Sequence, residues 1–406
     1  MHVVMLSDLE TAGGAAVAAS RLAVGLVDAG VDVTRVVSKR GGQVHPWKTQ
    51  EFHLEHGLPS RLANRFLSDA VGDEVHQHAI RRKLASELRA LRPDVINIHN
   101  VHGAFWSAEI MRACAEVAPV VWTLHDMWSF TGRCAYNYSC PKFMSGCDAT
   151  CPTPHEYPAL APDRIRPAWE KRRKMFADYP QVCAVAPSRW LAATAQSGLW
   201  SSHRVEVIPY GLNLETFAPL DRAESRRELG ITPAGPVLLA SAMDVTERRK
   251  GLDLLAAAIE SLRDERITLL TMGQGSFSMP GVDVVPLGLI TDERHQRCAY
   301  SAADLLVHPA RADNLPNVLL EAIACGTPAL TFAVGGMPDA VRPGVTGWLA
   351  DDISAEALAA ALRVALGSVA SGVTLRESCR AVAEAEYALS IQADRYRALF
   401  SELVAA

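Results

Sequence analysis

Short apolar runs alternate with longer helical patterns along nearly all of this chain of 406 residues. Many repeats of a strand followed by a covering helix are typical of a parallel sheet with helices on both faces. This rhythm predicts the α/β class. No apolar run reaches the roughly 18 residues that a membrane-spanning helix needs.

The rhythm is interrupted once, between Val207 and Asn213, where a strand ends in Pro209 and Gly211. We therefore expect two doubly wound, Rossmann-like domains facing a cleft: the first over residues 1–212, the second over 213–385, and a last helix over 386–406 that packs back on the first domain. In such sheets ligands bind beyond the carboxyl ends of the strands. The predicted strands are His2–Leu6, Val31–Val37, Asp94–Ile98, Val120–Leu124, Val182–Val185, Val205–Ile208, Val237–Ala242, Ile267–Thr271, Val282–Pro286, Asp304–Val307 and Ala329–Phe332.

The composition excludes several classes of protein. The chain is 49% hydrophobic and 21% charged, which does not fit intrinsic disorder. Its net charge of -5 argues against a general nucleic-acid binder. The residues from Met1 to Asp8 lack the charged lead and the long apolar core of a secretory signal. We therefore expect a cytoplasmic protein without a transmembrane segment.

The second half holds the clearest candidate binding residues. Glu321 is the only charge in the apolar run Val318–Ala324, and a carboxylate buried there needs hydrogen-bond donors. Ribose hydroxyls or a structural arginine would both supply them. The segment Asp313–Asn317 follows a predicted strand, where ligands bind in this architecture.

Cations and glycines at predicted helix starts point to an anion. Arg248, Arg249 and Lys250 precede a predicted helix, and three cations there oppose the helix dipole. Either a phosphate removes that conflict, or the loop is simply solvated. The pairs Gly13-Gly14 and Gly335-Gly336 each follow a strand, so they either offer backbone N–H groups to an anion or only form turns.

Two predicted strands of the first half end in histidine. His125 and Asp126 follow the strand Val120–Leu124, and His99 and Asn100 follow the strand Asp94–Ile98. A single histidine of this kind is as often structural as functional. Because the carboxyl ends of parallel strands meet at one edge, the two together favour a polar site there.

These segments together resemble a retaining glycosyltransferase of family four, which has the GT-B fold. The resemblance covers nearly the whole chain and is most specific over Ala312–Pro328. It continues at Arg249–Gly251, at Val207–Asn213 and at the Gly335-Gly336 turn. The segment Thr123–Tyr136 resembles a branch that acts in surface-polysaccharide and natural-product assembly.

The resemblance implies that a sugar passes from a UDP- or GDP-linked donor to a hydroxyl, amine or thiol of a small-molecule or glycan acceptor. Lys250 and Arg249 would neutralise the departing diphosphate, and Glu321 would hold the ribose. The implied residues are Lys250, Arg249, Asp313 and His125 for catalysis, Gly13, Gly14, Arg248, Asn314, Leu315, Pro316 and Glu321 for the donor, and His99, Asn100 and Asp126 for the acceptor.

The chain departs from the family pattern at three positions. Asp313 replaces the first Glu of an E-x7-E motif, Asp244 replaces an Arg six residues before the Lys, and Asn213 replaces a common Asp. With Lys250 as one cation for the diphosphate, the second cation is then Arg248 or Arg249. No D-x-D spacing occurs, so we expect fixed cations and backbone amides to stabilise the leaving group, with no cofactor required for catalysis.

An insert over about residues 126–165 contains four of the nine cysteines: Cys134, Cys140, Cys147 and Cys151. Four thiolates can hold a structural zinc ion. Their spacings of five, six and three intervening residues differ from the usual short pairs, so zinc and free or paired thiols both stay open. The cationic segment Trp169–Lys174 predicts either a solvated helix face or a contact with a phosphorylated or lipid-linked acceptor, which would be a peripheral membrane contact.

Other functions fit the same residues. A nucleotide-sugar epimerase on this fold would turn over the donor without an acceptor, and a sugar phosphorylase would need free phosphate. A degenerate transferase acting as an interaction module would bind no nucleotide.

Overall fold

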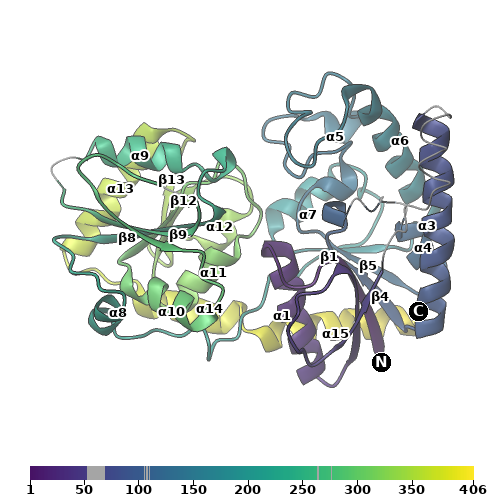
Figure 1. Ribbon diagram of the computed structural model, residues 1–406, viewed down its shortest axis with the longest axis horizontal. Helices are drawn as coiled ribbons and strands as arrows, with labels where there is room; N and C mark the ends of the chain where they lie inside the picture. The colour runs from purple at the N-terminus through teal and green to yellow at the C-terminus, as the bar shows by residue number, and fades with distance from the viewer. Residues whose placement is uncertain (53–68, 105, 107, 109, 263–264, 276) are drawn as a thin grey trace. The chain divides into compact units, whose positions relative to one another are not determined.

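The computed structural model describes residues 1–52, 69–104, 106, 108, 110–262, 265–275 and 277–406. Its internal contacts divide the chain into two compact units (Figure 1). Unit 1 comprises Met1–Ile208 and Gln392–Ala406, and unit 2 comprises Pro209–Ile391. The chain therefore leaves unit 1 four residues before the predicted boundary at 212 and returns after residue 391, not after residue 385.

Unit 1 contains a parallel sheet of seven strands in the order β3-β2-β1-β4-β5-β6-β7. Alternate residues of β1 face opposite sides of this sheet: Val3 and Met5 pack into one apolar cluster, Val4 and Leu6 into the other. The strands are β1 (His2–Leu9), β2 (Asp32–Lys39), β3 (Lys48–Glu51), β4 (Val95–Ile98), β5 (Val120–Thr123), β6 (Cys183–Ala186) and β7 (Val205–Val207).

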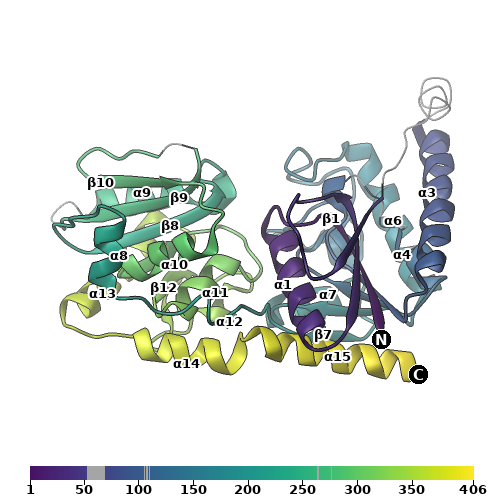
Figure 2. The ribbon, with the colours of Figure 1, turned by 60° about the horizontal axis from the view of Figure 1, so that its bottom comes forward.

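Helices cover both faces of this sheet. Apolar residues of α1 (Gly14–Asp28) and α15 (Leu389–Ala405) pack on one face, and Figures 1 and 2 show the two helices on the same side. Phe400 of α15 is fully buried in that cluster. The other face is covered by α3 (Asp69–Leu91), α4 (Ile110–Ala115), α6 (Pro162–Asp178) and α7 (Arg189–Gln196).

Unit 2 repeats the arrangement with a parallel sheet of six strands in the order β10-β9-β8-β11-β12-β13. In each sheet the order reverses between the first and fourth strands, as in dinucleotide-binding folds. The strands are β8 (Val237–Asp244), β9 (Thr268–Gln274), β10 (Asp283–Gly288), β11 (Leu305–His308), β12 (Ala329–Phe332) and β13 (Gly347–Ala350).

The two faces of the second sheet carry different helices (Figure 1). Helices α9 (Leu252–Glu260) and α13 (Ala355–Ala370) pack on one face. Ser354 caps α13, because its Oγ accepts a hydrogen bond of 3.2 Å from the backbone N–H of Ala357. The other helices are α8 (Arg222–Glu228), α10 (Glu293–Ala302), α11 (Asn317–Ala324), α12 (Met337–Ala340) and α14 (Arg376–Glu386).

Every strand predicted from the sequence is present, and two further strands within the described residues were missed. Both missed strands, β3 and β13, lie at the edge of their sheet. The last helix expected over residues 386–406 corresponds to α15 (Leu389–Ala405), and α14 ends just before it at Glu386. No helix in the described residues is both long enough and apolar enough to cross a membrane.

Candidate functional site

The predicted donor residues of unit 2 follow β8 and β11, the two strands at which the strand order reverses. Lys250 ends a 3-10 turn, η3 (Arg248–Lys250), after β8. Asp313 lies five residues after the end of β11. In open α/β sheets this crevice at the carboxyl edge is where ligands bind.

Asp313 gathers three nitrogen donors around one carboxylate. Lys250 Nζ donates to its Oδ2 at 2.7 Å, and Arg249 Nη1 lies 3.3 Å from the same oxygen. His308 Nε2 is also 3.3 Å from it. The structure therefore brings together three of the four predicted catalytic residues, all in unit 2.

The charge state of this cluster follows from its surroundings. Burial alone would raise the pKa of Asp313, but Lys250, His308 and Arg249 together hold that pKa well below its usual value. Burial lowers the pKa of His308, although Asp313 partly opposes the shift. Asp313 is therefore an anion that holds two cations in position.

The neighbouring predicted donor residues differ in exposure. Asn314, Leu315 and Pro316 are buried, and the backbone N–H of Asn314 donates to Asp313 Oδ1 at 3.0 Å. The side chain of Arg248 is exposed. Gly335 packs directly on this segment, since a Cβ atom placed there would be 2.0 Å from the carbonyl oxygen of Asp313.

Glu321 is buried in α11, as predicted, with an exposed fraction of 5%. Its Oε2 accepts a hydrogen bond of 2.6 Å from the hydroxyl of Tyr300. This partner is a tyrosine of α10, and the ribose contact of Glu321 stays a prediction.

In unit 1 the predicted acceptor residues meet at the carboxyl edge of β4 and β5. His99 Nδ1 lies 2.9 Å from His125 Nε2, and Asn100 Nδ2 donates to Asp126 Oδ2 at 3.3 Å. Burial lowers the pKa of His125 to about 4 and the pKa of His99 well below its usual value. Both imidazoles are therefore neutral at physiological pH.

Three residues of the same edge were not predicted. His102 Nε2 donates to Asp126 Oδ2 at 2.9 Å, and Tyr157 OH lies 3.1 Å from His102 Nδ1. Asp8, near the end of β1, accepts a hydrogen bond from the backbone N–H of Gly103. The rule that singled out His125, a polar group after an apolar strand, applies equally to Asp8.

Gly13 and Gly14 lie at the start of α1, as predicted. Gly13 is its N-cap with φ of 87°, a left-handed conformation that favours glycine. Gly14 is the first residue of the helix.

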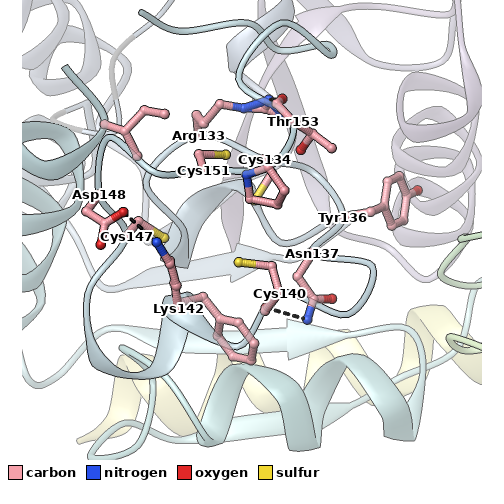
Figure 3. A pocket seen from close by; sticks show the side chains of 13 residues that line it. Arg133, Cys134, Tyr136, Asn137, Cys140, Lys142, Cys147, Asp148, Cys151 and Thr153 are labelled. Carbon is pink, nitrogen blue, oxygen red and sulfur yellow. Dashed lines mark hydrogen bonds and ion pairs between the residues drawn. The ribbon is translucent and has the colours of Figure 1, made fainter. Parts of the chain in front are cut away.

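The four clustered cysteines line one pocket of unit 1, and Figure 3 shows their side chains around the same hollow. All four are free thiols, and burial raises the pKa of Cys147 to about 11. Lys142 Nζ donates to Asp148 Oδ1 at 2.6 Å at the edge of the pocket.

Within the described part of the chain, no three His, Cys, Asp or Glu side chains are placed to hold a metal ion. The four cysteines share one pocket, and the zinc site that the sequence offered for them stays a prediction. Helix α5 (Lys142–Ser145) lies between Cys140 and Cys147 in the chain.

Comparison with known proteins identifies the class. A family model described as Glycosyltransferase Family 4 matches residues 12–216, and one described as Glycosyl transferases group 1 matches residues 235–368. The chain belongs to glycosyltransferase family 4, which confirms the resemblance found at residues 123–136 and 312–328.

Curated relatives match part of the chain. A putative colanic acid biosynthesis glycosyl transferase, WcaC of Escherichia coli K12, is 32% identical over 252 residues, which cover 60% of each chain. A D-inositol 3-phosphate glycosyltransferase of Actinosynnema mirum is 35% identical over 207 residues, 43% of this chain and 49% of that protein. The chain thus matches roughly half to 60% of the length of these relatives.

Solved structures share the fold over the whole chain. Sucrose-phosphate synthase from Thermosynechococcus elongatus has a TM-score of 0.73 at 21% identity and covers 100% of this chain and 99% of its own. Anabaena HepE in complex with UDP-glucose has a TM-score of 0.67 at 16% identity. The match covers 99% of this chain and 100% of the HepE chain. The two Rossmann-like units are those of the GT-B fold, as predicted.

Proposed function

We propose that this chain transfers a sugar from a UDP- or GDP-linked donor to an acceptor, with retention of configuration and without a metal. Unit 2 holds the donor, and unit 1 holds the acceptor. HepE, a protein with the same fold, was solved with UDP-glucose, which supports a nucleotide-sugar donor.

The observation that carries the proposal is the cation pair at the carboxyl edge of β8. Asp313 holds Lys250 and Arg249 through one carboxylate oxygen. An ammonium group has three N–H donors, so Lys250 can keep its bond to Asp313 and still donate to a phosphate oxygen. Fixed cations of this kind stabilise negative charge as it develops on a leaving group.

The reaction exchanges one bond at the anomeric carbon. The bond to the diphosphate oxygen breaks, and the bond to the acceptor atom forms on the same face of the sugar. The leaving phosphate oxygen takes the proton of the acceptor, so no protein carboxylate is needed as a nucleophile. Lys250 and Arg249 neutralise the diphosphate, and Glu321 holds the ribose.

Replacing Lys250 with Ala tests the diphosphate contact. A hydrogen bond to a charged group contributes about 1.5–3 kcal/mol, so we expect UDP or GDP to bind at least about 10-fold more weakly, while uridine or guanosine binds equally well. Titration calorimetry measures both affinities. Arg266→Ala, which removes an exposed cation just before β9, is the matched control. If Lys250→Ala loses as much affinity for the nucleoside as for the nucleoside diphosphate, Lys250 does not contact the diphosphate.

Glu321→Gln tests the ribose contact. The variant keeps an oxygen acceptor but loses the charge, so we expect weaker binding of UDP or GDP. The preference for the ribonucleotide over its 2′,3′-dideoxy analogue should be smaller than in the unchanged protein, because a neutral amide oxygen accepts more weakly than a carboxylate. If the preference is undiminished, Glu321 does not hold the ribose.

Product analysis distinguishes the reaction from its alternatives. Mass spectrometry of the donor with candidate acceptors should show a glycosylated acceptor and a free nucleoside diphosphate. Donor turnover without an acceptor would identify an epimerase, and a requirement for phosphate would identify a phosphorylase. Absence of any nucleotide binding would leave an interaction module.

A further inference from the structure

Three neighbouring strands of unit 1 end in polar side chains, of which only Asp126 was predicted to bind the acceptor. Asp8 lies near the end of β1, His102 lies in a 3-10 turn (η1, His102–Ala104) after β4, and Asp126 follows β5. Tyr157 reaches the same edge from the cysteine-containing insert, 55 residues along the chain from His102.

Asp126, His102 and Tyr157 form a chain of hydrogen bonds with a defined direction. Asp126 accepts from Trp128 N at 2.8 Å through Oδ1 and from His102 Nε2 at 2.9 Å through Oδ2. An ionised carboxylate only accepts, so His102 carries its proton on Nε2. In the neutral ring Nδ1 then accepts from the hydroxyl of Tyr157, whose oxygen lone pairs are left for a ligand.

Asp8 supplies a second acceptor close to that hydroxyl. Its Oδ1 accepts from Leu9 N at 2.8 Å and its Oδ2 from Gly103 N at 3.1 Å. Each carboxylate oxygen has room for a further donor. A Cβ atom on Gly103 would lie 2.4 Å from Asp8 Oδ2 and 3.3 Å from Tyr157 OH, so the two oxygens flank the same point.

Aromatic rings border these polar groups. The ring of His102 lies 5.3 Å from that of Trp128 and 5.5 Å from that of Tyr157, measured between centroids. Tyr157 is 68% exposed although its hydroxyl is held by His102. A few fixed polar groups beside aromatic surface are typical of small-molecule sites.

We propose that Asp8 and the Tyr157–His102–Asp126 chain form the subsite that binds two neighbouring hydroxyl groups of a sugar or polyol acceptor. This inference rests on the proposed function and deepens it, because it names the acceptor class. Asp8 takes a hydroxyl donor, while Tyr157 can accept from or donate to the second hydroxyl. His102 and Asp126 are positioning residues that hold the Tyr157 hydroxyl.

Two substitutions test the two ends of the subsite. Tyr157→Phe deletes a hydroxyl from an exposed ring, and Asp8→Asn removes the charge while keeping one acceptor oxygen. The probes are glucose, galactose and myo-inositol, with glucosamine as the amine and 1-thioglucose as the thiol, each titrated by saturation-transfer NMR into protein saturated with UDP or GDP. Tyr138→Phe, on an exposed tyrosine of the same insert, is the control.

We expect the polyols to bind the unchanged protein and the Tyr138→Phe variant equally. Tyr157→Phe should bind them about 3- to 10-fold more weakly, and Asp8→Asn about 10-fold or more. Affinity for UDP or GDP should not change, which separates this inference from the proposed function. Polyol binding that survives both substitutions, preferential binding of the amine or thiol, or no polyol binding at all would overturn it.

The pH dependence of polyol affinity tests the role of His102, because a purely structural residue would not affect it. It faces Asp126 and Asp8 from the strand ends, His125 beside Asp126, Arg172 from α6 and Tyr157 from the insert. When His102 gains a proton, Nδ1 becomes a donor and Tyr157 must donate outward. Polyol affinity should therefore change with pH in the unchanged protein and become flat in His102→Gln. An identical pH profile in both would remove His102 from the subsite.

Discussion

Gly335 shows how one backbone position supports the donor site. Its φ is 61°, and a Cβ atom there would lie 2.0 Å from the carbonyl oxygen of Asp313. Gly344 has a similar φ of 74° but no heavy atom within 4 Å of its Cβ position. The two glycines thus share the left-handed conformation and differ only in what lies beside them.

We expect Gly344→Ala to cost about 1 kcal/mol of unfolding free energy, because alanine tolerates positive φ poorly. Gly335→Ala should lose the same unfolding free energy, and its methyl group must also displace the segment that carries Asp313. It should therefore weaken binding of UDP or GDP about 10-fold or more. Urea unfolding and titration calorimetry measure the two effects. Equal nucleotide affinity in both variants would show that contact with Asp313 is unimportant.

Site residues with a local sequence signal were predictable, whereas those whose partner is distant in the chain were not. His99 and His125 follow apolar strands, and that position alone predicted that both lie at one edge of the sheet. Tyr157 lies in a long insert with no periodicity, so nothing in the sequence indicated its contact with His102. Asp126 was predicted as an acceptor residue, but its bond to His102 depends on how β4 and β5 pair.

Among the elements, most strands were predictable from an apolar run, including the edge strands β7 and β10, whereas the edge strands β3 and β13 were missed. The β3 sequence Lys48–Glu51 contains no apolar residue, and β13 begins with Gly347. An edge strand pairs on one side only and can be short and polar. These two strands are therefore set by pairing with β2 and β12, which the sequence pattern does not encode locally.

Helix α6 carries the cationic segment whose environment the sequence left open. Arg172, within that segment, faces inward with an exposed fraction of 7%. Its Nη1 donates to the carbonyl oxygens of Thr131 and Gly132 at 2.9 and 2.8 Å, and its guanidinium lies 4.5 Å from the Trp128 ring. The segment is therefore not uniformly solvated, and one of its cations ties the insert to α6.

Arg172→Met should destabilise unit 1 by about 2–3 kcal/mol, because two carbonyl groups lose a charged donor. The neighbouring Arg173 is exposed, so Arg173→Met should change stability by no more than about 0.5 kcal/mol. Seven of the eight tryptophans lie in unit 1, so tryptophan fluorescence during urea unfolding reports on this unit. If the two variants are equally stable, the hydrogen bonds from Arg172 to the insert do not stabilise unit 1.

The path of the whole chain makes unit 1 depend on both ends of the sequence. Tyr396, Leu399 and Phe400 of α15 complete an apolar cluster that begins with Val3 and Met5 of β1. The hydroxyl of Tyr396 lies 2.9 Å from Thr123 Oγ1 at the end of β5. Unit 1 therefore cannot be complete until the last residues have returned from unit 2, although its strands come from the first half of the chain.

The stability of unit 1 should fall as the pH falls from 7 to 5. Burial lowers the pKa of His125 from 6.5 to about 4, so the unfolded chain binds a proton more readily than the folded one and acid favours unfolding. His99 shifts in the same direction, whereas His102, whose pKa Asp126 raises, opposes them. For His125 alone the loss at pH 5 is on the order of 2 kcal/mol.

Urea unfolding at pH 7 and pH 5, followed by tryptophan fluorescence, measures this loss. His125→Asn should reduce the difference between the two pH values, because asparagine does not titrate. His155→Asn replaces an exposed histidine of the insert and should leave the difference unchanged. If His125→Asn keeps the full difference, the buried imidazole at the end of β5 is not what makes unit 1 sensitive to acid.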